Sequence, residues 1–247
     1  MEFDVITLFP HMFDPVFNCS IMGRARENEL FKLRVHNLRD FTEDRHRTVD
    51  DYPFGGGRGM VLKPDPIWSS VEHIRSNFKK EKHKIFLMSP AGKVFNHNMA
   101  MELSHLEQMI LICGHYEGVD ERVIEYLIDD EISIGDYVLS GGELPAMVII
   151  ETIVRLIPGV LPDESVQTDS FYSSILSFPQ YTRPRNFKGY EVPHVLISGH
   201  HEAVRKWRRT KAIEKTLVCR PELLNNLELT DEDKKIIVEI NERQVLN

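Results

Sequence analysis

Cysteine is scarce in this sequence. The 247 residues contain only Cys19, Cys113 and Cys219, an odd number at wide spacing. This pattern fits neither a disulfide framework nor a zinc site, because both need paired or clustered cysteines. We therefore expect reduced thiols, as in a cytoplasmic protein.

Long apolar runs and a leader sequence are also missing. The most apolar stretch, residues 146–161, is interrupted by Glu151, Arg155 and Pro158, so it is too short and too polar to span a membrane. The N-terminal segment MEFDVITLFPHMF has no basic region before its apolar residues and no small-residue cleavage site. Neither a membrane span nor export is expected.

Basic residues are outnumbered overall, and the net charge of −8 argues against a nucleic-acid partner. The charge is unevenly distributed, however. Residues 183–220 contain ten Lys and Arg against three Asp and Glu, a net charge of +7, whereas residues 113–170 contain two against thirteen, a net charge of −11. The first segment suits phosphate groups and the second repels them.

Short β-rich segments alternate with helical patterns over the first two thirds of the chain. The expected strands are FDVITLF, KLRVHNL, IFLMS, MILIC and EISI. Apolar residues recur on one helical face between Pro64 and Lys79, and VDERVIEYLI and ELPAMVIIETIVRLI are also expected to be helices. The last of these is apolar enough to be buried or to meet a partner subunit. The alternation predicts βαβ units and a mainly parallel sheet.

The periodic pattern stops near Pro158. Residues 158–186 are rich in Pro, Ser, Asp and Thr and are typical of a long linker. After them, HHEAVRKWRRTKAIEKTLVC predicts a basic helix, and Thr230 and Asp233 have the spacing of a capping box at the start of another helix. We expect a small helical domain in this part of the chain.

Four glycine-containing loops lie at the ends of predicted elements. They are SPAGK, CGHYEG, SIGDYVLSGGE and, earlier in the chain, FGGGRGM. Ligands of parallel α/β sheets gather beyond the carboxyl ends of the strands, where glycine lets the backbone approach them. Each glycine alone could serve only a turn or a helix end, but three loops from consecutive strands could converge on one pocket.

None of these loops fits a phosphate-binding signature. FGGGRGM lacks the spacing of a dinucleotide motif, and no glycine stands at the P-loop distance before Gly92 and Lys93. Polyphosphates would also be repelled by the nearby acids, which are Glu117, Asp120, Glu121, Asp136 and Glu143. The charge favours a neutral or cationic ligand with adenosine-like polar edges, a description that S-adenosylmethionine fits.

Several strings carry a resemblance to a known family. GHYEGVDERVIE, SIGDYVLSGGELPA, PGVLPDESVQTDSF, FPQYTRP, EVPHVLISGHH and VCRPELL occur in this order, with FGGGRGM upstream. Together they resemble the bacterial tRNA (guanine-N1)-methyltransferase family TrmD, of the SPOUT class, nearly from end to end. The resemblance implies an α/β fold: a parallel-sheet domain with a deep trefoil knot, and a small helical C-terminal domain. The implied boundaries are 1–160 for the cofactor-binding domain, 161–178 for a linker that is disordered without tRNA, and 179–247 for the tRNA-binding domain.

Members of this family transfer the methyl group of S-adenosylmethionine to N1 of the guanosine just 3′ of the anticodon, tRNA position 37, and work as homodimers. The resemblance therefore implies that this chain binds the same cofactor. Mapped by motif, the cofactor-binding residues are Ser89, Pro90, Gly114, Tyr116, Glu117, Gly118, Ile134, Gly135, Asp136, Tyr137, Val138, Leu139, Gly141, Gly142 and Pro145.

Guanine N1 carries a proton at neutral pH, so its methylation needs a general base and a group that stabilises negative charge at O6. By resemblance, Asp169 is the base and Arg155 stabilises the charge, and the base and the cofactor come from different protomers. From spacing alone, Asp169 could instead cap a helix or be a solvated loop acid. Arg155 could instead form an ion pair on a buried helix.

The basic residues around Trp207 could bind the phosphates of an RNA backbone, and the Trp207 ring could stack on a base. A helix face that is simply exposed to solvent would have the same composition. The residues expected to bind tRNA are Arg183, Arg205, Trp207, Arg208 and Arg209. The histidines show no metal-binding spacing, so no metal site is expected. The resemblance implies that magnesium assists the reaction, but the sequence identifies no residue that would bind the ion.

Two positions depart from the family pattern. Arg58 stands where a small residue or proline is expected, and His115 stands where arginine is frequent. Two competing interpretations remain open: a nucleotide-dependent enzyme that uses the same loops for phosphate, and a non-catalytic RNA-binding protein.

Overall fold

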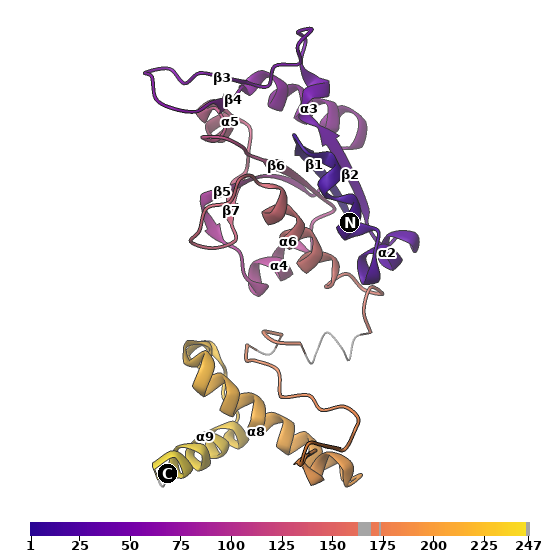
Figure 1. Cartoon of the computed structure of the whole chain (residues 1–247), viewed down its shortest axis with the longest axis vertical. Helices are drawn as coiled ribbons and strands as arrows, with labels where there is room; N and C mark the ends of the chain where they lie inside the picture. Colours follow the sequence, from indigo (N-terminus) through magenta and orange to yellow (C-terminus); the bar gives the residue numbers. More distant parts are fainter. Residues whose placement is uncertain (163–168, 173, 246–247) are drawn as a thin grey trace. The chain divides into compact units, whose positions relative to one another are not determined.

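The protein divides into two compact units, Met1–Pro162 and Asp163–Asn247 (Figure 1). The computed structural model describes residues 1–162, 169–172 and 174–245. Within these residues, no helix is both long and apolar enough to cross a membrane.

A five-stranded sheet in which every pairing is parallel forms the centre of the first unit. The order across the sheet is β2-β1-β6-β5-β7. The strands are β1 (Glu2–Thr7), β2 (Lys32–Asn37), β5 (His83–Val94), β6 (Gln108–Cys113) and β7 (Asp130–Ser133). The five predicted strands and their parallel arrangement are therefore confirmed.

Helices cover both faces of this sheet. On β1, Phe3 and Val5 enter one apolar cluster and Ile6 enters the other, as the alternation of side chains along a strand requires. The first cluster contains residues of α1 (Asp14–Phe17), α2 (Ser20–Glu27), α4 (His97–Leu103) and α6 (Glu143–Val154). The second contains residues of α3 (Pro64–Phe78) and α5 (Glu121–Tyr126). Every residue of β6 is buried, which explains the apolar run from Met109 to Cys113.

The predicted helix after Pro64 is present as α3. Pro64 occupies its first turn, where the missing N–H leaves no hydrogen bond unmade. Ile67, Val71 and Ile74 on its apolar face are fully buried, so this face packs against the sheet.

A small antiparallel hairpin, β3 (Asp50–Asp51) and β4 (Val61–Leu62), carries the FGGGRGM loop. Leu62 bridges to Val119, beyond the end of β6, and its N–H donates to the Gly118 carbonyl at 3.0 Å. Short 3₁₀ turns, Pro10–Met12 and Leu38–Phe41, follow β1 and β2. The hairpin thus brings an early glycine loop beside the carboxyl end of β6.

The SPAGK segment lies inside β5, whereas the sequence suggested a loop at the strand's end. Met88 and Lys93 both pair with Ile132, and the residues between them bulge out of the ladder. A Cβ on Gly92 would lie 2.4 Å from backbone atoms of Glu131 and Ile132. Gly92 is therefore needed for the close approach of β5 and β7.

The segment after β7 folds back onto the strand ends. The Gly142 N–H donates to the Gly114 carbonyl at 2.9 Å, and Gly141 forms a bridge with His115. The helix predicted for ELPAMVIIETIVRLI is present as α6 (Glu143–Val154), and it packs in the first apolar cluster. The trefoil knot stays a prediction.

The second unit is mainly helical. Its elements are the hairpin β8 (Asn186–Phe187) and β9 (Tyr190–Glu191), 3₁₀ turns at His194–Ile197 and Pro221–Asn226, and the helices α8 (His201–Cys219) and α9 (Asp231–Val245). Its buried core consists of Ile175, Ala212, Ile213, Ile236 and Ile240.

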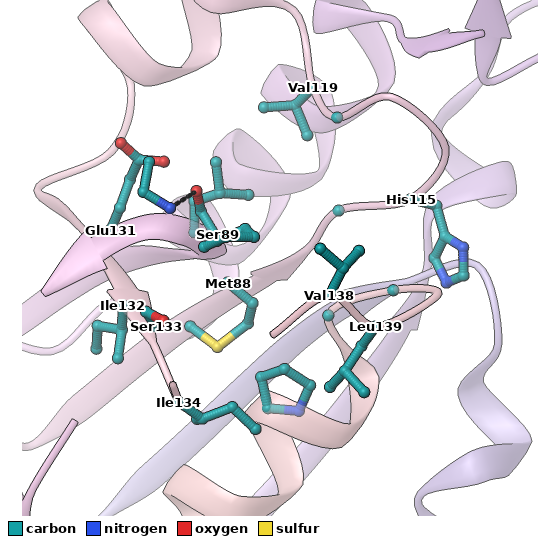
Figure 2. A pocket seen from close by; sticks show the side chains of 18 of the residues that line it. Met88, Ser89, His115, Val119, Glu131, Ile132, Ser133, Ile134, Val138 and Leu139 are labelled. Carbon is teal, nitrogen blue, oxygen red and sulfur yellow. Dashed lines mark hydrogen bonds between the residues drawn. The ribbon is translucent and has the colours of Figure 1, made fainter. Parts of the chain in front are cut away.

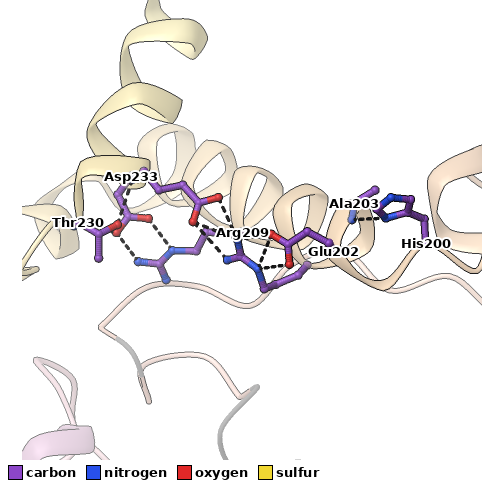
Figure 3. A network of polar contacts seen from close by, with 8 residues as sticks. His200, Glu202, Ala203, Arg209, Thr230 and Asp233 are labelled. Atoms are coloured by element: carbon purple, nitrogen blue, oxygen red, sulfur yellow. Dashed lines mark hydrogen bonds and ion pairs between the residues drawn. The ribbon is translucent and has the colours of Figure 1, made fainter.

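The predicted capping box is confirmed at the start of α9. The Thr230 N–H donates to Asp233 Oδ2, and the Asp233 N–H donates to Thr230 Oγ1, both at 3.1 Å. Arg209 of α8 joins the same carboxylate through Nε at 2.8 Å and a terminal nitrogen at 2.9 Å (Figure 3). This bidentate contact lowers the pKa of Asp233 to about 2 and links the two helices.

Of the expected linker, residues 163–168 and 173 lie outside the described residues. Near its end, Ile175 is buried in the core of the second unit and Phe178 packs against that core. Ser170 and Ser177 are joined through their hydroxyl groups at 3.1 Å. The domain boundaries and the disorder of the linker without tRNA stay predictions.

Asp4 of β1 forms a buried polar network across three strands. Its carboxylate accepts hydrogen bonds from Arg34 at 2.6 and 2.7 Å, from His36 at 2.8 Å and from Gln108 at 2.7 Å. Burial alone would raise the pKa of Asp4, but these hydrogen bonds outweigh it and lower the pKa from 3.8 to about 2. The charged form of Asp4 therefore stabilises the sheet.

We predict that Asp4→Asn lowers the free energy of unfolding by about 3 kcal/mol at neutral pH, because Arg34 loses its most buried partner. The pKa of Asp4 is lower in the folded state than in the unfolded state. Its stabilisation is thus complete above pH 4 and is lost as the pH falls from about 4 to about 2. Urea denaturation of both proteins across this range should show the difference shrinking, and a constant difference would contradict the role of charge.

Candidate functional site

A cavity of about 520 Å³ opens beside the bulge of β5 and beyond the carboxyl ends of β6 and β7 (Figure 2). This is the edge at which parallel α/β sheets bind their ligands. Three segments form its walls: the bulge of β5, the loop after β6 and the loop after β7. The loops after β6 and β7 therefore converge on one pocket as predicted, whereas the third wall is the SPAGK bulge within β5, which contributes Ser89, Pro90 and Ala91.

Most residues that the sequence pointed to as cofactor-binding line this cavity. They are Ser89, Pro90, Gly114, Tyr116, Glu117, Gly118, Ile134, Gly135, Tyr137, Val138, Leu139, Gly141, Gly142 and Pro145. Asp136 is the exception, since it does not line the cavity. The structure adds residues that sequence reasoning missed: Leu87, Met88, Ala91, His115, Val119, Glu121, Ile124, Glu131, Ile132, Ser133 and Ser140. Several of these are ordinary apolar core residues, which no local motif distinguishes.

The cavity combines an apolar floor with acidic edges. Met88 and Ile132 are almost fully buried at its base, and Glu117, Glu121 and Glu131 stand around it. Among the described residues that line it, none is lysine or arginine. Such a surface accepts an apolar or cationic group and repels phosphate.

Two glycines show why the backbone itself forms the wall. A Cβ on Gly142 would lie 2.7 Å from Cys113 Cα and 3.0 Å from the Gly114 nitrogen, so only glycine permits this approach. Gly135 has a φ of 143°, and a Cβ there would meet the Tyr137 ring at 2.6 Å. Tyr116 lines the same cavity with a φ of 60°, a conformation that costs energy outside glycine and concentrates at functional sites.

The FGGGRGM loop does not line this cavity itself but contacts Glu117, which does. The Glu117 N–H donates to the Met60 carbonyl at 3.0 Å. A Cβ on Gly59 would lie 2.4 Å from Glu117 Oε1, so this glycine makes room for the carboxylate. Phe54, at the start of the loop, is fully exposed. The fourth glycine loop thus supports a residue of the cavity without lining it.

A buried hydrogen-bond network lies under the cavity. Glu143 is 2% exposed and accepts a hydrogen bond from Thr7 Oγ1 at 2.6 Å, and its other oxygen lies 2.8 Å from His115 Nε2. Burial, with the Glu143 carboxylate nearby, raises the pKa of the Cys113 thiol. Sequence reasoning missed this network because Thr7 and Glu143 are 136 positions apart.

Arg155 and Asp169 belong to different units. Arg155 follows the last residue of α6, and its N–H donates to the Glu151 carbonyl at 3.2 Å. Asp169 lines a cavity of about 480 Å³ in the second unit, together with Phe178 and residues of α8. The catalytic roles expected for Arg155 and Asp169 stay predictions.

Two of the arginines expected to bind tRNA are engaged within the second unit. Arg205 contacts Glu202 and Glu232, and Arg209 contacts Asp233 (Figure 3). Of the other expected residues, Trp207 packs against Tyr181 with ring centroids 6.2 Å apart. Arg208 lies over the Phe178 ring at 4.8 Å, and Arg183 is exposed.

Comparison with known proteins assigns the chain to a family. A family model described as tRNA (Guanine-1)-methyltransferase TrmD matches residues 1–226. The chain belongs to the TrmD family. The predicted resemblance is thereby confirmed, and the match covers the cavity of the first unit and α8 of the second. As members of this family are SPOUT proteins, the predicted α/β fold class is confirmed as well.

Individual TrmD proteins match over nearly their whole length. Each of three such relatives is named tRNA (guanine-N(1)-)-methyltransferase. The protein of Dictyoglomus turgidum is 53% identical over 241 residues, 97% of this chain and 96% of its own. That of Staphylococcus carnosus is 52% identical over 238 residues, 96% of both chains. That of Desulforamulus reducens is 49% identical over 241 residues, 97% of this chain and 95% of its own.

Metal ligands are not gathered in the described part of this TrmD chain. No group of three or more His, Cys, Asp or Glu side chains there could hold a metal ion. The three cysteines are free, with Cys113 buried and Cys19 and Cys219 exposed.

Proposed function

We propose that this protein transfers the methyl group of S-adenosylmethionine to N1 of the guanosine at tRNA position 37, next to the anticodon. The observation that carries the proposal is the cavity formed by the bulge of β5 and the loops after β6 and β7, in which no described lining residue is lysine or arginine. The names of the relatives, which span nearly the whole chain, support the reaction.

The cavity residues fit the cofactor. The apolar floor, with Met88 and Ile132, suits an adenine ring and a methionine chain, and the close-packed loop backbones offer N–H and C=O groups for its polar edges. Glu117, Glu121 and Glu131 favour a positive sulfur. S-adenosylmethionine supplies an electrophilic methyl group, and the cavity walls hold it in place and exclude water.

Asp169 and Arg155 supply the remaining chemistry. The Asp169 carboxylate takes the proton from guanine N1, which frees the nitrogen electron pair for the methyl group. The Arg155 guanidinium stabilises the negative charge that develops at O6. The magnesium assistance that the resemblance implies stays a prediction, and no described side chains are assigned to that ion.

We predict that Asp169→Asn keeps cofactor affinity and lowers kcat by roughly 100-fold or more, because only the proton acceptor is removed. Transfer of labelled methyl from S-adenosylmethionine to a tRNA transcript, followed by mapping of the modified base, measures both activity and site. The matched control is Asp163→Asn, a neighbouring acid with no assigned role. Near-normal turnover of Asp169→Asn would falsify the assignment, and methylation by neither variant nor wild type would favour a non-catalytic RNA-binding protein.

The basic helix α8 is the proposed tRNA surface. Lys206 and Arg208 are exposed, whereas Arg205 and Arg209 are held in ion pairs. Neither Lys206 nor Arg208 is held by a carboxylate in the described residues, although Arg208 lies over the Phe178 ring. Both can bind phosphate without first breaking an ion pair, so they are the better candidates for tRNA contact. Arg209 has a structural role through its contact with Asp233.

We predict that Lys206→Glu with Arg208→Glu raises the KM for tRNA at least tenfold at moderate salt and leaves the Kd of the cofactor unchanged. The control is Lys234→Glu with Lys235→Glu, which changes the charge equally on α9. A KM for tRNA that rises equally in both pairs would assign the effect to net charge, and an unchanged KM would exclude this face of α8.

A homodimer is proposed from an apolar surface on the first unit. Leu144 and Val148 of α6 are 50% and 44% exposed, and Val16 of α1 is 37% exposed. A shallow cavity of about 290 Å³ lies between α2 and α6, lined by Met147 and Val148 among others. A second copy of this chain would cover this surface, as exposed apolar patches generally mark interfaces.

Because the base and the cofactor are proposed to come from different protomers, inactive subunits should complement each other. We predict that mixing Asp169→Asn with Arg155→Ala subunits restores up to about a quarter of wild-type activity, since one of the two sites in a mixed dimer is intact and half of random dimers are mixed. Dimers carrying two different affinity tags isolate the mixed species. Absence of recovery in these dimers would show that each site belongs to one chain.

A further inference from the structure

The Thr7–Glu143–His115 network joins three elements of the first unit under the cavity. Thr7 ends β1, Glu143 is the first residue of α6, and His115 lies in the loop after β6. The side chains of His115 and Glu143 are 13% and 3% exposed. His115 also lines the cavity and is labelled in Figure 2.

Burial makes Glu143 dependent on its partners. A carboxylate removed from water is costly unless hydrogen bonds and charges compensate. Glu143 accepts from the Thr7 hydroxyl at 2.6 Å and is paired with His115 Nε2 at 2.8 Å. Its place at the first residue of α6 adds the favourable field of a helix N-terminus. The Glu143 carboxylate therefore depends on both partners, and loss of either Thr7 or His115 leaves a buried charge without one of its two contacts.

The same network controls the position of the turn that precedes α6. A Cβ on Gly141 would lie 2.0 Å from His115 Nε2 and 2.5 Å from Glu143 Oε2, so this turn rests directly on the pair. Gly141 also bridges to His115 through the backbone, and the next residue, Gly142, donates to the Gly114 carbonyl. Gly114, Gly141 and Gly142 all line the cavity.

His115 is fixed on its other side as well. Its ring packs against Phe9, with centroids 4.9 Å apart, and the Phe9 N–H donates to Thr7 Oγ1 at 2.9 Å. The imidazole is thus held between the end of β1 and the Gly141 turn. Its orientation follows from Glu143 and Phe9, and the position of the turn follows from the imidazole.

We propose that His115 is a positioning residue for the cofactor cavity: held by buried Glu143, it sets the Gly141–Gly142 turn against the end of β6 and thereby determines the affinity for S-adenosylmethionine. This inference rests on the proposed function. It assigns to His115 a role in cofactor affinity and none in proton transfer, which remains with Asp169.

The test compares His115→Leu with His115→Gln, whose amide nitrogen can take the place of Nε2 as a hydrogen-bond donor to Glu143. We expect His115→Leu to raise the Kd of S-adenosylmethionine and of its demethylated product at least tenfold, the scale of losing a hydrogen bond to a charged group. We expect His115→Gln to restore most of the affinity, and kcat at saturating cofactor to stay within about threefold in both. Isothermal calorimetry and tRNA methylation measure these quantities.

Ser70→Ala is the matched control for lost stability. Ser70 is fully buried in α3, where its hydroxyl donates to the Ile67 carbonyl at 2.7 Å, and it does not line the cavity. This variant should be destabilised without a change in cofactor Kd. Thr7→Val, which removes the hydroxyl and keeps the shape, should weaken cofactor binding in the same direction as His115→Leu if His115→Leu itself does not fold.

Three outcomes would overturn the inference. One is an unchanged Kd in His115→Leu and Thr7→Val. Another is an equal rise of Kd in Ser70→Ala, which would assign the effect to stability. The third is a large loss of kcat at saturating cofactor with Kd unchanged, which would place His115 in the chemistry. If wild-type protein binds no S-adenosylmethionine, the proposed function fails too, so the wild-type titration separates the two failures.

Discussion

The candidate site depends on one close contact, between the turn at Gly141 and Gly142 and the end of β6. A side chain on Gly142 would meet the backbone of Cys113 and Gly114, so the two segments touch backbone to backbone. Below them, the Glu143 carboxylate is held by Thr7 and His115. This contact makes the loop after β7 a wall of the cavity.

The acidic charge of the cavity and the basic charge of the second unit have different physical origins. Glu117, Glu121 and Glu131 stand around the cavity, which no described lysine or arginine lines. On α8, Arg205 and Arg209 are occupied by acids of α8 and α9, and they stabilise the helix pair. The net charge of the segment therefore overstates the cationic surface available to tRNA.

Strong periodic patterns in the sequence predicted the elements that carry the site. The five parallel strands, α3, α5, α6 and α8, and the capping box of α9 were predicted, because each has a periodic apolar or charged pattern or a specific capping pair. The helices α2 and α4 and the two hairpins were not predicted, because their residues show no clear apolar period. The SPAGK segment was expected after a strand and lies within β5, because pairing with β7 resumes at Lys93.

The sequence by itself determined the family, the five strands and fourteen of the residues that line the cavity, because these depend on local residue patterns. Only the tertiary structure decided which strands are neighbours, that Gly92 serves strand packing, and that His115 and Glu143 meet Thr7 beneath the cavity. The physical reason is distance along the chain. Hydrogen bonds between residues more than a hundred positions apart form only once the sheet is assembled, and no local pattern records them.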